Sequence, residues 1–141
     1  MKIPLKITAS LTNQSYLLAD HNGWLQMDMV IGVKISLSGV HKIPDICDDL
    51  AGVYPKTFVL IGWHLCCHCH VTPVMGSSEN FMAYLRGEEK LYNTQILEMP
   101  QNFIKYVEKN KEQIAEMKIQ PDWVKYNFIN GDIRNGLIIS N

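Results

Sequence analysis

The sequence predicts a small α+β fold, and three features of the chain lead to this prediction. Residues 31–37 alternate between apolar and polar side chains, which is typical of a strand with one buried face. Residues 100–117 carry apolar side chains at helical spacing within a charged segment. Between them, six of the seven residues 64–70 are Cys or His, a density that packing alone rarely requires. We therefore expect an N-terminal helix, a few short strands with a Cys/His metal knuckle, and a helical C-terminal extension.

Length and composition limit the size of the fold and the kinds of partner that the chain is expected to bind. The chain has 141 residues, of which 47% are hydrophobic, enough for one domain with a modest core. Its net charge is -1, and of its 13 basic residues only Arg86 and Arg134 are arginine. Arginine supplies most bidentate contacts to phosphates and bases. Direct binding to nucleic acid is therefore not expected.

Targeting signals and membrane segments are not evident. Two lysines lie within Met1–Ile7, but no apolar run of signal-peptide length follows them, and no stretch approaches the ~20 apolar residues that span a bilayer. We expect a soluble cytoplasmic protein. In a reducing compartment, its four cysteines are expected to bind metal or stay free rather than form disulfides.

Helices and strands can be assigned along the first half of the chain. Rough helical spacing predicts a helix over Ser10–Met29, with a break at Asn22-Gly23. The alternation at 31–37 predicts the clearest strand. Residues 41–50 are expected to form a loop with one helical turn. The apolar run 57–61 predicts a short buried strand that leads into the Cys/His cluster.

The second half is richer in charge and in helix-forming residues. Gly76–Glu79 has the composition of a turn and a helix N-cap, so we divide the chain into residues 1–75 and 76–141. Pro100 suits the first turn of a helix. The apolar positions of that helix are Phe103, Val107, Ile114 and Met117. Asp122–Tyr126 is expected to add one or two further helical turns.

The Cys/His cluster predicts a metal site, because thiolate and imidazole are preferred zinc ligands. His64, Cys67 and Cys69 are three closely spaced donors. Cys47 lies 17 residues before His64 and can complete a Cys3His set, with His41 as a substitute.

Several alternatives remain open at the level of the residues alone, one of which is a redox or catalytic thiol. If residues 64–70 formed a flat strand, a different set of metal ligands would lie together on one face, because alternate residues of a strand share a face. That set is His64, Cys66, His68 and His70. Alternatively, no metal binds, and these residues are ordinary packing cysteines and capping histidines.

A catalytic site is a weaker hypothesis. Asp45, Asp48 and Asp49 lie near His41 and Cys47, and carboxylates beside a metal can support hydrolysis. A catalytic zinc must keep an open coordination position, however, whereas a Cys3His set is closed. A solvated loop with a helix N-cap explains the aspartates more simply, so we assign no catalytic residue.

The central part of the chain resembles a known family. Residues 45–56 contain D-I-C-D-x-L-x-G-x-Y-P-K, if Asp49 and Ala51 take variable positions, and residues 62–69 contain G-W-H-x-x-C-x-C. This pattern is similar to that of phage head morphogenesis proteins, the Mu F-like minor head family, in the form found in phages and prophages of Bacteroides-type bacteria. Weaker similarity extends over residues 10–128.

The chain also departs from the family pattern. Leu65 stands where the family has proline, and His68 stands where it has arginine. The long N-terminal part of a full-length member is missing. The resemblance therefore implies a C-terminal part only, either a shortened prophage copy or a separately expressed piece.

The resemblance selects one ligand set. Matched position by position, it implies zinc bound by Cys47, His64, Cys67 and Cys69, with His41 as the alternate ligand. On the resemblance, the remaining Cys and His residues of the cluster are not zinc ligands. These are Cys66, His68 and His70.

The function that the resemblance implies is structural. We expect a minor head component that acts in capsid assembly or DNA packaging through contacts with portal or capsid proteins, in the bacterial cytoplasm or in the virion. No small-molecule substrate and no membrane partner are expected. The alternative is a metal-dependent nuclease or toxin-like effector, suggested by His41, Asp45 and His64.

Overall fold

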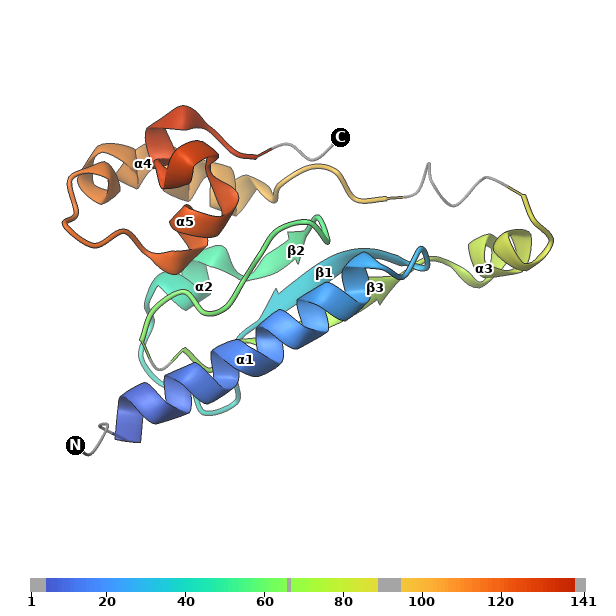
Figure 1. The fold of residues 1–141 in the computed structure, drawn as a ribbon, viewed down its shortest axis with the longest axis horizontal. Coiled ribbons are helices and arrows are strands. Elements are labelled where there is room, and N and C mark those ends of the chain that lie inside the picture. The colour runs from blue at the N-terminus through green and yellow to red at the C-terminus, as the bar shows by residue number, and fades with distance from the viewer. Residues whose placement is uncertain (1–4, 66, 89–94, 139–141) are drawn as a thin grey trace.

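The computed structural model has an α+β fold, as the sequence predicts (Figure 1). It describes residues 5–65, 67–88 and 95–138, with side chains from residue 11 onward. Two short 3-10 helices close the described chain, and its elements follow one another in a fixed order. That order is α1 (Leu5–Leu25), β1 (Val30–Ser36), α2 (Ile46–Leu50), β2 (Gly52–Tyr54), β3 (His70–Met75), α3 (Ser78–Leu85), α4 (Gln101–Ala115), α5 (Asp122–Asn127), η2 (Ile129–Gly131) and η3 (Ile133–Asn135).

The sheet has the order β2-β1-β3, with both neighbours antiparallel to β1. The predicted strand at 31–37 is thus confirmed as the central strand. Its Gly32 is required by close contacts, because a Cβ there would lie 2.7 Å from Ile96 Cδ1 and 2.9 Å from the Tyr54 carbonyl oxygen. The Ile96 N–H donates to the Ile31 carbonyl oxygen at 2.8 Å, which holds the segment before α4 against this strand.

The helices agree with the sequence in type and differ in detail. The predicted N-terminal helix is confirmed, but the predicted break is wrong, because α1 continues through Asn22-Gly23 to Leu25. The Ser77 side chain accepts from the Asn80 N–H and caps α3, as expected. The predicted helix after Pro100 and the turns at 122–126 are confirmed as α4 and α5. No helix of the described residues is long and apolar enough to cross a membrane.

The predicted strand at residues 57–61 is wrong, although the burial it implied is present. Phe58, Leu60 and Ile61 are buried, yet the segment has no strand partner. Instead, the Val59 N–H donates to Asn127 Oδ1 and the Val59 carbonyl accepts from Asn127 Nδ2, both at 2.7 Å. A side-chain amide from α5 thus takes the place of a neighbouring strand.

One aromatic cluster forms the centre of the hydrophobic core. Its rings lie 4.7 to 6.4 Å apart between centroids, mostly tilted or edge-to-face, as aromatic pairs prefer. Its members are Tyr54, Phe58, Trp63, Phe103, Tyr106, Trp123 and Phe128. The core therefore draws residues from both sides of the division at residue 75, and that division stays a prediction.

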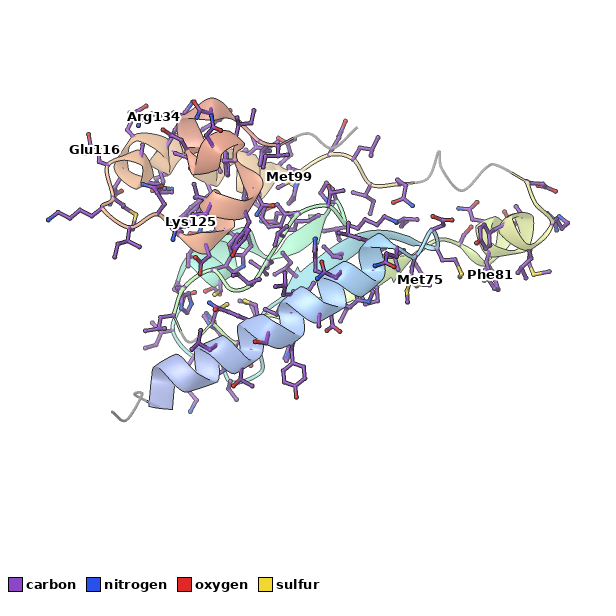
Figure 2. The ribbon with its side chains drawn as sticks, in the orientation of Figure 1. Met75, Phe81, Met99, Glu116, Lys125 and Arg134 are labelled. Carbon is purple, nitrogen blue, oxygen red and sulfur yellow. The ribbon has the colours of Figure 1, made fainter. Side chains whose placement is uncertain are left out.

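The chain from the end of β3 through α3 forms an arm that extends away from α4 and α5 (Figure 1). Met75 and Phe81 lie on this arm, whereas Met99, Lys125 and Arg134 lie in the C-terminal helical part (Figure 2). The fold thus places the residues of the Cys/His cluster near α2 and α1, and α3 far from them.

The Tyr54 hydroxyl links α2 to the core, and a substitution that removes it measures how much this link contributes to stability. It donates to the Leu50 carbonyl oxygen at 2.7 Å, and burial raises the pKa of Tyr54. We expect Tyr54→Phe to lower the free energy of unfolding by about 1 to 1.5 kcal/mol, because a buried carbonyl loses its donor. Urea denaturation measures this change. Tyr16→Phe is the control, since Tyr16 is 71% exposed; an equal loss in both variants would contradict the interpretation.

Candidate metal centre

Cys47 is positioned by the first turn of α2. Asp45 is the N-cap, and its Oδ1 accepts from the Cys47 N–H at 2.8 Å. The Asp45 N–H donates to Asp48 Oδ2 at 2.7 Å, which completes a capping box. The predicted helix N-cap role of the aspartates is therefore confirmed for this pair. Because the cap holds the backbone of Cys47, its thiol has a defined direction toward the following loop.

His64 and Cys67 lie on a tight turn of that loop. The Cys67 N–H donates to the His64 carbonyl oxygen at 3.2 Å. Gly62, just before the turn, has φ of 122°, a conformation that favours glycine. The Asn13 side chain donates to the Cys67 carbonyl oxygen at 3.1 Å and ties the turn to α1. The loop therefore presents both donors toward α2.

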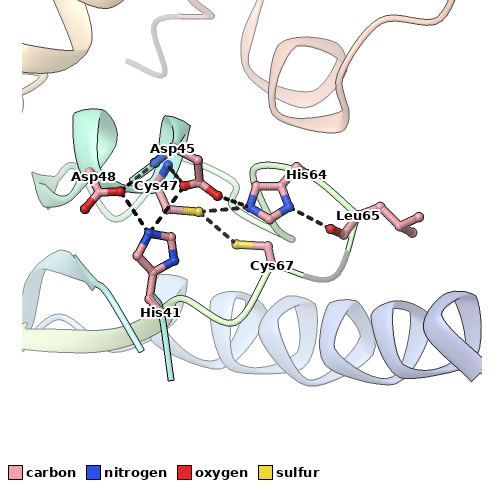
Figure 3. Close-up of polar contacts among 7 residues, drawn as sticks. All are labelled: His41, Asp45, Cys47, Asp48, His64, Leu65 and Cys67. Atoms are coloured by element: carbon pink, nitrogen blue, oxygen red, sulfur yellow. Dashed lines mark hydrogen bonds and ion pairs between the residues drawn. The ribbon is translucent and has the colours of Figure 1, made fainter. Parts of the chain in front are cut away.

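The three donors converge at distances that suit a tetrahedral metal (Figure 3). Cys47 Sγ lies 3.7 Å from Cys67 Sγ and 3.2 Å from His64 Nε2, and all three atoms lie within 4.8 Å of one another. Two sulfurs on one tetrahedral zinc are about 3.8 Å apart, and sulfur and imidazole nitrogen about 3.6 Å. The group is therefore close enough to hold a metal ion.

The imidazole of His64 is oriented as a ligand. Its Nδ1 lies 2.6 Å from the Leu65 carbonyl oxygen, which can only accept a hydrogen bond, so Nδ1 carries the proton. Its Nε2 faces Cys47 Sγ at 3.2 Å and Asp45 Oδ2 at 3.3 Å, and in this tautomer it is the nitrogen that can bind a metal. Backbone carbonyls commonly fix the tautomer of metal-binding histidines in this way.

Cys69 lies beside the other two thiols but outside the closest group of three. Hydrogen bonding with the Cys69 thiol lowers the pKa of Cys67, while hydrogen bonding with Cys67 and burial raise the pKa of Cys69. Burial also raises the pKa of Cys47. All three cysteines are buried. Without a cation, such a cluster favours one thiolate at most, and a bound metal is what would let all three ionise.

His68 and His70 do not join this group. Residues 67–69 form no strand, so the flat-strand face that would have grouped the even-numbered residues is wrong for them. His68 and His70 are exposed, and His70 begins β3 opposite Ser36. Cys66 lies outside the described residues.

His41 pairs with carboxylates rather than with the thiols. Its Nε2 lies 2.8 Å from Asp48 Oδ2 and 3.6 Å from Asp45 Oδ1. The hydrogen bond to Asp48 raises the pKa of His41, and the Asp45 N–H lowers the pKa of Asp48. These three residues also lie close enough to hold an ion, but the Asp48 oxygen nearest His41 already accepts the capping bond. The contacts among these three residues stabilise the first turn of α2, and this structural role accounts for their proximity.

A cavity that the sequence did not predict borders the centre. Its volume is about 290 Å³. It is lined by Ser38, Val40, His41, Lys42, Ile43, Asp45, Cys47, His64, His68 and Cys69. No local pattern could have found it, because it forms only when the 38–45 loop meets the cluster.

The two carboxylate oxygens of Asp45 have different contacts: Oδ1 caps α2 and lies 3.6 Å from His41 Nε2, and Oδ2 lies 3.3 Å from His64 Nε2. We expect Asp45→Ala to lower the free energy of unfolding by about 1 kcal/mol through loss of the cap. Asp45→Asn should recover most of this loss, because asparagine caps equally well. Chemical denaturation of the two variants measures the difference. If the Asn variant were as unstable as the Ala variant, the carboxylate charge rather than the cap would be responsible.

Comparison with known proteins adds no relative to this description. No protein-family model, curated protein or solved structure matches the chain.

Proposed function

We propose that this chain is a zinc-stabilised structural module that acts through protein contacts, as a minor head, or head morphogenesis, component of a phage or prophage. Zinc is bound by Cys47, His64, Cys67 and Cys69. The observation that carries the proposal is the convergence of Cys47, from α2, with His64 and Cys67, whose donor atoms lie close enough together to share one metal ion.

The position of the donors supports a structural role for the metal. Cys47, Cys67 and Cys69 belong to the same buried cluster as the aromatic core. A Cys3His set leaves no coordination position for a substrate. Zinc in this place joins the loop and α2 to the core, and contributes to folding rather than to chemistry.

The family resemblance is the basis for the proposed role in a phage head, and it also suggests the partners. Several residues of the resembling pattern have structural roles here: Asp45 caps α2, Tyr54 bonds to Leu50, and Trp63 packs in the aromatic core. These roles support a module in which the residues of the pattern build the fold. Its partners on this proposal are portal or capsid proteins.

Metal analysis of single variants tests the zinc site. The purified protein should contain one zinc per chain, measured by elemental analysis together with protein concentration. Cys47→Ser and Cys67→Ser should lose it, and Cys69→Ser should reduce it strongly. Cys66→Ser is the matched control and should retain it. Loss at Cys66 with retention at Cys67 would overturn the ligand set.

Co-expression tests the proposed partners. The chain should co-purify with the portal or major capsid protein of the same phage or prophage when the two are expressed together. An unrelated portal protein is the control. A gene neighbourhood without portal, terminase or capsid genes, together with no co-purification, would contradict the head role.

A second candidate, a metal-dependent nuclease or effector, is favoured by one observation. The cavity of about 290 Å³ brings His41, Asp45 and His64 together beside the proposed metal position. Incubation of the zinc-loaded protein with DNA and RNA tests it. We expect no cleavage; metal-dependent cleavage that is lost in Asp45→Asn would replace the structural proposal.

A further inference from the structure

Two thiols from different parts of the chain lie almost in contact (Figure 3). Cys47 Sγ, on α2, lies 3.7 Å from Cys67 Sγ, on the loop before β3, although the two residues are 20 positions apart in sequence. Both are free cysteines in this structure. The sulfurs of a disulfide are about 2.05 Å apart, so an approach of about 1.7 Å separates this pair from a covalent bond.

The two cysteines differ in how their backbone is held. The Cys47 N–H is fixed by the Asp45 cap at the start of α2. Cys67 lies in a segment without helix or strand, held by hydrogen bonds to the His64 carbonyl oxygen and from the Asn13 side chain. The loop of Cys67 is therefore the part that can move toward α2, and this small movement brings the sulfurs to bonding distance.

The cavity beside the cluster gives a small oxidant a route to Cys47. Its volume is about 290 Å³, and its lining includes Cys47 together with Val40 and Ile43, which are 66% and 76% exposed, so the cavity opens to solvent. A water molecule takes about 30 Å³ in the liquid, and hydrogen peroxide is only slightly larger. Cys47 and Cys67 are themselves only 1% and 5% exposed. An oxidised sulfur here therefore meets the neighbouring thiol rather than a thiol of another chain.

We propose that Cys47 and Cys67 are a redox pair, which hydrogen peroxide converts into an intramolecular disulfide with release of the bound zinc. The Cys47 thiolate attacks one peroxide oxygen, the O–O bond breaks, hydroxide leaves, and the sulfur becomes a sulfenic acid. The Cys67 thiolate then attacks that sulfur, forms the S–S bond and expels the second hydroxide. The pair loses two electrons to the peroxide, and two protons from solvent convert both hydroxides into water.

The disulfide replaces the metal as the link between the loop and α2. Zn²⁺ leaves because thiolates, not disulfide sulfurs, are its ligands. The release of zinc rests on the proposed function, whereas the disulfide rests on the contact between the two sulfurs. In a reducing compartment, such a bond is transient and typical of redox sensing. Excess thiol together with Zn²⁺ should restore the starting form.

Titration of the purified full chain with hydrogen peroxide tests the pair. Its zinc content is measured first, and a metal-binding dye then follows the Zn²⁺ that is released. Trypsin digestion without reduction should yield peptides 43–56 and 57–86 joined by a disulfide, and fragmentation of the joined peptides should place the bond between Cys47 and Cys67. One Zn²⁺ should be released for each disulfide formed.

A matched variant and an unfolded sample serve as controls. Cys66→Ser should form the same bond and release the same amount of zinc. Protein oxidised in concentrated urea should instead form a mixture of bonds, because the contact between Cys47 and Cys67 is lost. A bond from Cys47 to Cys69, bonds only between chains, or zinc release without any disulfide would overturn the proposal. Protein that holds no zinc before oxidation contradicts the proposed function, and the joined peptides then still decide whether the redox pair exists.

Discussion

On the proposed function, removing the zinc is expected to unfold most of the domain at room temperature. Structural zinc contributes about 10 to 16 kcal/mol of apparent binding free energy in small domains, and the whole stability of a domain is about 5 to 15 kcal/mol. Cys47, Cys67 and Cys69 belong to the hydrophobic core, so loss of the metal leaves a packed group of thiols without the cation that joins them. The core around them should then loosen together with the loop.

Chelation followed by spectroscopy measures this effect. Trp63 and Trp123 lie in the core, with ring centroids 5.7 Å apart, so their fluorescence and near-ultraviolet circular dichroism report on its packing. Both signals should fall when a strong zinc chelator is added and recover on addition of Zn²⁺ but not of Mg²⁺, which prefers oxygen ligands. If elemental analysis shows that the metal is gone while the melting temperature is unchanged, the structural role is contradicted.

The pH dependence of the zinc-bound protein has a defined sign. Zinc binds deprotonated thiolates, so protons compete with the metal and its affinity falls as pH decreases. The melting temperature of the zinc-bound protein should therefore fall between neutral and mildly acidic pH, and a higher concentration of free Zn²⁺ should restore part of the loss. Differential scanning fluorimetry at several pH values and two zinc concentrations measures both effects. A melting temperature that stays constant over this pH range would indicate that the ligands do not titrate with the metal.

Elements with a strong local signal could be predicted from the sequence. The alternation that ends at Leu37 and the spacing of Phe103 and Val107 reflect burial of one face, and this burial is what the folded chain retains in β1 and α4. The Asn22-Gly23 pair, in contrast, is only a weak local preference. A cost of about 1 kcal/mol for glycine in a helix is readily offset by packing, and α1 is anchored on both sides of the pair by Leu17, His21 and Trp24.

The candidate site could be predicted in its ligand types but not in its surroundings. Closely spaced cysteines and histidines indicate a metal whatever the fold, and Cys47, His64 and Cys67 do lie together. The cavity and the pairing of His41 with Asp48 depend on how the 38–45 loop folds back, which no local spacing specifies. The sequence therefore indicates the possible metal ligands, and the tertiary structure determines which of them lie close together.

Asn127 explains why residues 57–61 are buried without forming a strand, and its removal should be costly. The side chain makes three hydrogen bonds: two with the backbone of Val59, and one from Nδ2 to the Trp123 carbonyl oxygen at 2.8 Å. It lies 68 residues from Val59 in sequence, so no local pattern predicts the pair. Asn127→Ala leaves the N–H and the carbonyl of Val59 without these partners, and we expect a loss of about 3 kcal/mol in the free energy of unfolding. Asn110→Ala is the control, because the Asn110 side chain donates to the Tyr106 carbonyl oxygen within its own helix.

A second substitution separates the amide's donor from its acceptor. Asn127→Asp keeps an oxygen for the Val59 N–H but turns the other oxygen toward the Val59 and Trp123 carbonyls, which repel a carboxylate. Burial and this repulsion should raise the pKa of the new carboxyl above its unfolded value of about 3.9. Stability of the variant relative to the parent should therefore decline as pH rises through about 4 and level off only above the raised pKa. Denaturation at several pH values measures the difference between the two proteins. A constant difference would mean that the carboxylate reaches water, and that Val59 is held by its apolar neighbours rather than by the amide of Asn127.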